Sequence, residues 1–271
     1  MPDLKSHPCF ISPQQLNPHL PLFVFLPGMD GTGQLLRTQT DSLETAFDVR
    51  CLAIPPDDLT TWDVLSEQVF ALIQSEWQKQ PQRSVYLCGE SFGGCLAMKV
   101  ALLHPEFFQR IILVNPASSF NQKPLLECAT YFTEWIPDLF YRMGTYGLLP
   151  FLAALSRVAP RDRIDLLNAM KSVPPKTVHW RLSLLREFFV ADEDLARLTP
   201  PVLLLAGAAD RLLPSVAEAE RLERILPNAK RRILSRSGHT CLLEEEVRLY
   251  EVLKVEKFLE ADVPLQLTVN S

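Results

Sequence analysis

Short runs of aliphatic residues recur along the chain, and longer stretches with helical spacing of apolar residues separate them. The runs are rich in leucine, isoleucine and valine and do not alternate with polar positions, which is typical of strands covered on both faces of a parallel sheet. The alternation of such strands with helices is typical of βαβ units. The pattern predicts strands at 22–26, 49–54, 85–88, 111–114, 202–206 and 231–234, and helices at 62–80, 93–103, 215–225 and 242–259.

The alternation stops between about residues 120 and 198, where the pattern is helical and rich in aromatic residues. A helical insertion between two strands is most simply a cap laid across the top of the sheet. We therefore expect an α/β core formed by residues 1–119 and 199–271, and a helical cap or lid insertion at 120–198. The core should be a mostly parallel sheet of about six or seven strands with helices on both faces, and residues 263–271 should form a loose end.

Composition narrows the classes of function. The net charge of −5 argues against a nucleic-acid-binding protein, which is normally basic. The six cysteines include no C-x-x-C pair, and several fall in apolar segments, which favours reduced buried thiols and a reducing compartment. The N-terminus lacks the charged segment followed by an apolar segment that is typical of a secretion signal. The apolar stretch 143–156 is too short to span a bilayer. We expect a soluble protein, or one that sits at a membrane surface.

The segment Gly89-Glu90-Ser91-Phe92-Gly93 lies between a predicted strand and a predicted helix. A serine in a G-x-S-x-G turn between strand and helix is held in a strained conformation that lifts its hydroxyl above the sheet edge, and the glycines avoid collisions across the turn. The new helix points its positive N-terminus at the reacting atoms. Ser91 is therefore the candidate nucleophile, while Glu90 is either a second acid or, as we favour, a side chain that buttresses the turn.

A serine nucleophile needs a base and a group that orients the base. His239 follows the last predicted strand, at the carboxyl end where active sites of parallel sheets gather. Asp210 follows the strand before it, which puts Ser, Asp and His in the order expected along the chain. Asp192 and Asp194 precede that strand and are the fallback acids. The other histidines lie in the N-terminal segment, in a loop, at the end of a helix and in the cap: His7, His19, His104 and His179.

The glycine-rich loop Leu-Pro-Gly-Met-Asp-Gly-Thr-Gly (26–33) follows the first predicted strand, where a backbone N–H can face a developing oxyanion together with the N–H of Phe92. This loop does not fit a phosphate-binding loop, because Gln34-Leu35 stands where that motif requires Lys followed by Ser or Thr. It does not fit a dinucleotide-binding fingerprint either, because Leu36 stands in place of the third glycine. The chain contains no H-E-x-x-H and no paired ligands, so we expect neither metal nor cofactor. The three consecutive glutamates at 244–246 are interpreted as the solvent-exposed start of a helix.

These elements resemble the α/β-hydrolase superfamily over nearly the whole chain. Within this superfamily, the chain resembles the hydrolase portion of plastid phytyl ester synthases. The resemblance lies in three segments: the loop at 26–33, Cys-Gly-Glu-Ser-Phe-Gly-Gly-Cys-Leu-Ala (88–97) and Asn-Pro-Ala-Ser-Ser-Phe (115–120). The resemblance implies an esterase, lipase or thioesterase that handles fatty acyl groups, in a cytoplasmic or plastid-stroma-like compartment. Those plant proteins continue into an acyltransferase-like domain, whereas this sequence ends soon after its last predicted helix, so we expect cleavage of an acyl ester rather than its transfer.

The expected enzyme is a serine hydrolase that acts on a lipophilic carboxylic ester or thioester. Ser91 attacks the carbonyl, His239 takes its proton and Asp210 orients the histidine, while the backbone N–H groups of Met29 and Phe92 bind the oxyanion. Three alternatives stay open: acyl transfer to a long-chain alcohol, a haloperoxidase-like reaction of the same residues, and a non-catalytic ligand-binding protein.

The substrate hypothesis depends on the aromatic residues of the cap. Such side chains can line a long apolar pocket, and each buried CH₂ of an acyl chain contributes roughly 0.8 kcal/mol. Equally, they can form the core of the cap itself. A cap that touches a membrane surface to collect a lipid is a further hypothesis. The residues assigned to substrate binding are Phe132, Trp135, Phe140 and Tyr141.

Overall fold

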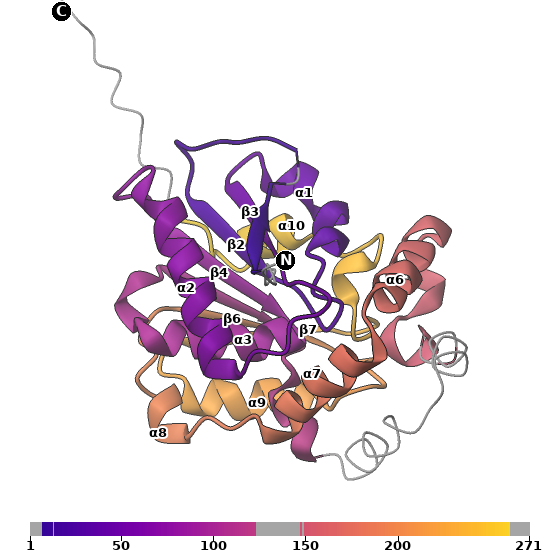
Figure 1. Cartoon of the computed structure of the whole chain (residues 1–271). Coiled ribbons are helices and arrows are strands. Elements are labelled where there is room, and N and C mark those ends of the chain that lie inside the picture. Colours follow the sequence, from indigo (N-terminus) through magenta and orange to yellow (C-terminus); the bar gives the residue numbers. More distant parts are fainter. Residues whose placement is uncertain (1–6, 13, 123–146, 148, 261–271) are drawn as a thin grey trace, which may run out of the picture.

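The computed structural model describes residues 7–12, 14–122, 147 and 149–260 (Figure 1). Seven strands form one sheet in the order β1-β3-β2-β4-β5-β6-β7. All neighbouring strands are parallel except β1 and β3, which are antiparallel. The mostly parallel sheet predicted from the sequence is confirmed. The strands are β1 (Cys9–Ile11), β2 (Leu22–Leu26), β3 (Asp48–Ala53), β4 (Val85–Glu90), β5 (Arg110–Val114), β6 (Val202–Gly207) and β7 (Ala229–Leu234).

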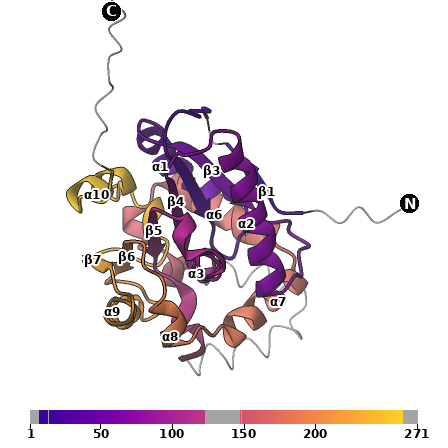
Figure 2. The ribbon, with the colours of Figure 1, turned by 90° about the vertical axis from the view of Figure 1, so that its left-hand side faces the viewer.

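Helices cover both faces of the sheet, and Figure 2 shows α2 and α10 on opposite sides of the strands. In β2, Val24 and Leu26 join one core cluster with residues of α2, α3 and α9, while Phe23 and Phe25 join a second cluster with residues of α1 and α10. Burial on both faces explains why β2 shows no alternation of polar positions. These helices are α1 (Arg37–Leu43), α2 (Trp62–Gln78), α3 (Phe92–Leu103), α9 (Ser215–Ile225) and α10 (Leu249–Val255).

Between β5 and β6 the described residues contain helices and short helical turns. Trp62 in α2 donates its indole N–H to the carbonyl of Leu184 in α7, at 2.8 Å, so α7 packs on the core. The division of the chain at residues 120 and 198 stays a prediction. The described elements of this segment are α6 (Pro160–Ser172), α7 (Pro175–Glu187) and α8 (Asp192–Leu195), with 3₁₀ turns at Ala117–Gln122 and Leu155–Arg157. Elsewhere in the described part of the chain, 3₁₀ turns lie at Gln34–Leu36, Pro105–Phe107 and Cys241–Leu243.

The helix predicted at 242–259 is wrong in its first half. A 3₁₀ turn ends at Leu243, the chain is then extended at Glu244, and α10 begins only at Leu249. The interpretation of 244–246 as a helix start is wrong, because α10 begins three residues later. Glu245 and Glu246 are exposed as expected, but the side chain of Glu244 is fully buried and paired with Arg157 at 2.7 Å. Because this partner comes from a distant segment, local periodicity does not indicate the break.

Four cysteines are buried free thiols, as the sequence predicts: Cys51, Cys88, Cys95 and Cys241. Burial raises the pKa of Cys51 to about 12, so this thiol is protonated and unreactive at neutral pH. Among the described residues, no helix combines the length and apolar character needed to cross a membrane.

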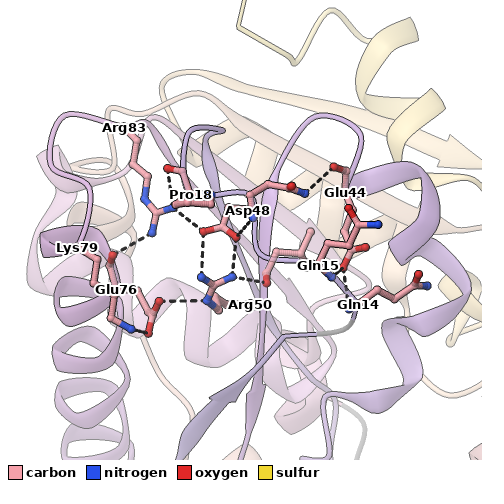
Figure 3. A network of polar contacts seen from close by, with 11 residues as sticks. Gln14, Gln15, Pro18, Glu44, Asp48, Arg50, Glu76, Lys79 and Arg83 are labelled. Carbon is pink, nitrogen blue, oxygen red and sulfur yellow. Dashed lines mark hydrogen bonds and ion pairs between the residues drawn. The ribbon is translucent and has the colours of Figure 1, made fainter.

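A buried ion-pair network ties the amino ends of the central strands together (Figure 3). Asp48, at the start of β3, is fully buried and accepts hydrogen bonds from Arg50 at 2.8 Å and Arg83 at 2.6 Å. Arg50 also contacts Glu76 of α2. Burial raises the pKa of Asp48, but the hydrogen bonds from both arginines outweigh it and hold the pKa below its usual value. The network therefore fixes the end of the sheet opposite to the G-x-S-x-G turn.

Candidate active site

Ser91 lies at the turn between β4 and α3, with φ 55° and ψ −114°. A non-glycine residue in such a conformation costs about 1–3 kcal/mol, which the surroundings must offset. The backbone N–H of Ser91 donates to Val114 at 3.0 Å, and its carbonyl accepts from Ala117 at 3.0 Å. The strained turn expected from the sequence is thus present and is held by the end of β5.

The two glycines of the turn permit close approach of backbone segments. A Cβ at Gly89 would lie 2.2 Å from the carbonyl oxygen of Gly93, and a Cβ at Gly93 would lie 2.1 Å from that of Leu26. No side chain fits at such distances, so β4, α3 and the end of β2 can pack this tightly only with glycine at both positions.

The structure brings the predicted nucleophile, base and acid together. His239 Nε2 lies 2.8 Å from Ser91 Oγ, and His239 Nδ1 lies 2.7 Å from Asp210 Oδ2. The side chains of His239 and Asp210 are 2% and 1% exposed. The fallback acids lie elsewhere, because Asp192 pairs with Arg221 and Asp194 with Arg197.

Asp210 is held by four hydrogen bonds. Its Oδ1 accepts the backbone N–H groups of Leu212 at 2.8 Å and Leu213 at 3.0 Å, and its Oδ2 accepts from the Ser215 hydroxyl and from His239. Burial raises the pKa of Asp210, but these hydrogen bonds outweigh it, so the pKa lies below its usual value. An ionised Asp210 can only accept, so His239 carries its proton on Nδ1 and presents a free lone pair on Nε2 to Ser91.

The loop at 26–33 lies beside the nucleophile. A Cβ at Gly28 would be 3.8 Å from Ser91 Cβ. Arg181 of α7, 2% exposed, donates to the carbonyl of Met29 at 2.6 Å and to that of Pro55 at 3.1 Å. Sequence reasoning missed Arg181, although an arginine on the apolar face of a helix is a signal that could have identified it. Holding the Met29 carbonyl also orients this loop next to Ser91.

Phe92 is the first residue of α3, and its ring stacks on Trp62 with centroids 4.6 Å apart. Both rings are buried. The assignment of the Met29 and Phe92 N–H groups to an oxyanion site stays a prediction, supported by the position of Phe92 directly after Ser91 at a helix N-terminus.

Two carboxyl groups lie next to the nucleophile. Glu90 immediately precedes Ser91, is 8% exposed, and its Oε1 has no hydrogen-bond partner among the described residues. Burial, and secondarily the charge of Asp30, raise the pKa of Glu90 to about 8. Burial likewise raises the pKa of Asp30, against hydrogen bonds from Thr32 and the charge of Arg181. Glu90 is therefore mostly protonated at neutral pH.

We expect Glu90→Gln to stabilise the protein at alkaline pH. Because the pKa of Glu90 is raised on folding, its protonated form favours the folded state below about pH 4.5, and that advantage is lost as the pH rises to about 8. The neutral amide avoids this loss, so the variant's gain in unfolding free energy should grow with pH to on the order of 3–5 kcal/mol. Urea denaturation at pH 5 and pH 8.5 measures it. The exposed Glu245→Gln is the control, and a gain at Glu90 that does not change with pH would contradict the prediction.

The aromatic residues assigned to substrate binding, Phe132, Trp135, Phe140 and Tyr141, lie outside the described residues. Two cavities of about 480 and 400 Å³ border α3 and the segment 188–197, but neither is lined by Ser91, Asp210 or His239. We therefore assign neither cavity to the acyl chain. Within the described part of the chain, no group of three or more His, Cys, Asp or Glu is arranged to hold a metal ion.

Comparison with known proteins shows which family and which relatives this chain is similar to. Residues 58–246 match the family described as "Serine aminopeptidase, S33". Phytyl ester synthase 1, chloroplastic, of Arabidopsis thaliana is 35% identical over 86% of this chain, which spans 36% of that relative's length. A pimeloyl-[acyl-carrier protein] methyl ester esterase of Vibrio vulnificus is 24% identical over 83% of this chain and 89% of its own.

Solved structures share the fold. An esterase from Exiguobacterium antarcticum superposes with a TM-score of 0.74, covering 93% of this chain and 95% of its own, at 18% sequence identity. At that identity the likeness concerns the arrangement of the sheet and helices alone. It agrees with the α/β-hydrolase fold expected from the sequence.

Proposed function

Since this chain belongs to the serine aminopeptidase S33 family of α/β-hydrolases and is an esterase-type enzyme, we propose that it cleaves a lipophilic carboxylic ester or thioester through Ser91, His239 and Asp210. The observation that carries the proposal is the buried chain of two hydrogen bonds, 2.7 Å from Asp210 to His239 and 2.8 Å from His239 to Ser91. The three side chains come from segments far apart in sequence and meet at one edge of the sheet.

The reaction proceeds in two steps. In the first, Ser91 Oγ attacks the acyl carbonyl while its proton passes to His239 Nε2, and Asp210 stabilises the imidazolium. The oxyanion accepts the N–H groups of Met29 and Phe92. The intermediate then expels an alkoxide or thiolate, which takes the proton from His239 and leaves an acyl ester on Ser91.

The second step removes the acyl group. His239 deprotonates water, which attacks the acyl-enzyme, and the tetrahedral intermediate collapses to a carboxylic acid as the proton returns to Ser91. A long-chain alcohol that reaches the acyl-enzyme in place of water yields a new ester. Acyl transfer is therefore the second candidate function, favoured by the identity of 35% with a phytyl ester synthase.

The lipophilic substrate and the compartment rest on the relatives. A relative named for a phytyl ester, in which the long apolar group is the alcohol, and another named for a pimeloyl methyl ester, in which the longer chain is the acyl group, both support an ester with a long carbon chain. The relative named chloroplastic supports a plastid-stroma-like compartment, where the buried thiols stay reduced. Residues 120–198 are proposed as the cap over the acyl site and as the part that touches a lipid surface.

We expect kcat/KM to rise with acyl chain length, by about fourfold for each methylene that enters an apolar site, because each contributes about 0.8 kcal/mol. The measurement is hydrolysis of p-nitrophenyl and acyl-CoA esters from C2 to C18, with and without a long-chain alcohol. Ester product formed in the presence of alcohol separates transfer from hydrolysis. Ser91→Ala supplies the uncatalysed background, and a maximum at C2 would overturn the lipophilic assignment.

A further inference from the structure

Asn115 lies at the centre of the candidate site without being one of its reacting groups. It directly follows β5, which lies between β4, whose end carries Ser91, and β6, which leads to Asp210. Its side chain is fully buried, and its backbone has φ 42°, a left-handed conformation that asparagine tolerates better than most residues.

The amide of Asn115 connects the loop that carries His239 to the end of β6. Its Nδ2 donates to the carbonyl oxygen of His239 at 2.6 Å and to that of Gly238 at 3.2 Å. Its Oδ1 accepts the backbone N–H of Gly207 at 2.8 Å. Since Nδ2 faces two acceptors and Oδ1 faces a donor, only one orientation of the amide satisfies all three groups.

The same loop is held from its other side by different partners. Gly238 N–H donates to Glu244 Oε1 at 2.7 Å, and Thr240 N–H donates to the carbonyl of Leu152 at 2.8 Å. A Cβ at Gly238 would lie 2.7 Å from the backbone nitrogen of Ala154, so the loop has little room to move in that direction. Asn115 holds the loop against the sheet at Gly238 and His239, while Ala209 N–H donates to the Ser237 carbonyl at 2.9 Å on the preceding residue of the loop.

We propose that Asn115 is a positioning residue that sets the imidazole of His239 within reach of both Ser91 and Asp210. The inference rests on the proposed function, because it concerns the base of that reaction. The direction of the His239 side chain follows from the peptide units on its two sides, and Asn115 binds the carbonyl oxygens of both. Losing them lets the peptide rotate, and a displacement of about 1 Å at a reacting group costs about 10²-fold in rate.

The pairing of β5 with β6 does not depend on this side chain, which contacts β6 only at its last residue, Gly207. The backbone N–H of Asn115 donates to the carbonyl of Leu205 at 2.9 Å, and β5 and β6 pair through their main chains from Ile111 to Val114. The side-chain amide instead bonds to Gly207, Gly238 and His239. Its removal should therefore affect the histidine loop more than the sheet.

Two substitutions test the proposal. Asn115→Asp keeps an acceptor for Gly207 N–H but replaces the donor to the two carbonyls by a second acceptor. Asn115→Gly removes the whole amide and still accommodates the positive φ. We expect both variants to show kcat reduced about 10²-fold with KM nearly unchanged, and labelling of Ser91 by a fluorophosphonate slowed by a similar factor. Circular dichroism and thermal melting, recorded on the same samples, monitor the fold.

The matched control is Asn228→Asp at the amino end of β7, where the asparagine amide also donates to a backbone carbonyl, that of Thr199 at 2.7 Å. It should keep wild-type kcat. If wild-type protein is not labelled, the proposed function fails and Asn115 is not implicated. If wild type is labelled and both folded Asn115 variants match its kcat, the positioning role is overturned. Unfolding of both variants would equally overturn it, since Asn115 would then support the sheet rather than the loop.

Discussion

Ser91→Ala is expected to abolish covalent labelling by a fluorophosphonate and to lower kcat by about 10⁶-fold, with the protein still folded. The hydroxyl is the atom that forms the acyl bond, and alanine leaves no group in its place. Because the positive φ of residue 91 is imposed by Val114, Ala117 and the glycines around it, alanine inherits the same backbone conformation. Intact-protein mass spectrometry after incubation with the probe measures the adduct.

The specificity of that result is checked by a second serine. Ser42→Ala removes a hydroxyl that donates to the carbonyl of Gln39 at 3.1 Å. Ser42 lies in α1, which covers the face of the sheet opposite to the face covered by α3. This variant should be labelled at the wild-type rate. His239→Ala should lose turnover and fast labelling while keeping its fold. An adduct that persists in Ser91→Ala would show that another nucleophile reacts, and the assignment of Ser91 would have to be abandoned.

The central strands β2, β4 and β6 could be predicted because each is buried at every position, on both faces of the sheet. In β2, every residue from Leu22 to Leu26 is buried, so local composition carries the whole signal. β1 has three residues and exists through its antiparallel pairing with Cys51–Ala53, which composition does not reveal. The error in the first half of the helix predicted at 242–259 has a similar cause, since Arg157 pairs with Glu244 in the interior from 87 positions away in the chain.

The reacting groups could be predicted because few residues qualify. Five histidines exist in the chain, and the rule that active sites lie at the carboxyl ends of parallel strands selects His239 among them. The residues that position these reacting groups could not be predicted in the same way. Asn115 and Arg181 act through hydrogen bonds to backbone atoms far away along the chain, and Ser215 acts through a hydrogen bond to the Asp210 carboxylate. The spacing of apolar residues can single out a buried arginine such as Arg181, but the partners of all three residues depend on tertiary contacts that local spacing does not encode.

Asp210→Asn is expected to lower kcat by about 10⁴-fold with little change in KM. The carboxylate accepts the Nδ1 proton of His239, which leaves Nε2 free to take the proton of Ser91. An amide at this position can place its NH₂ against Nδ1, and the imidazole then carries its proton on Nε2, where it cannot act as a base. The amide also carries no charge to stabilise the imidazolium. Steady-state kinetics on the best p-nitrophenyl ester measures both parameters.

A pH series distinguishes this loss from general damage. Because the folded-state pKa of Asp210 lies below its unfolded value, its ionisation stabilises the fold above the unfolded pKa, and that contribution disappears as the pH falls through the folded pKa. Asp210→Asn lacks the contribution, so its deficit in unfolding free energy relative to wild type should be largest at neutral pH and shrink in acid. Ser215→Ala keeps the carboxylate and removes one donor to it, and should lose far less activity. Wild-type kcat in Asp210→Asn would mean that the carboxylate does not orient His239, and a neighbouring group would have to do so.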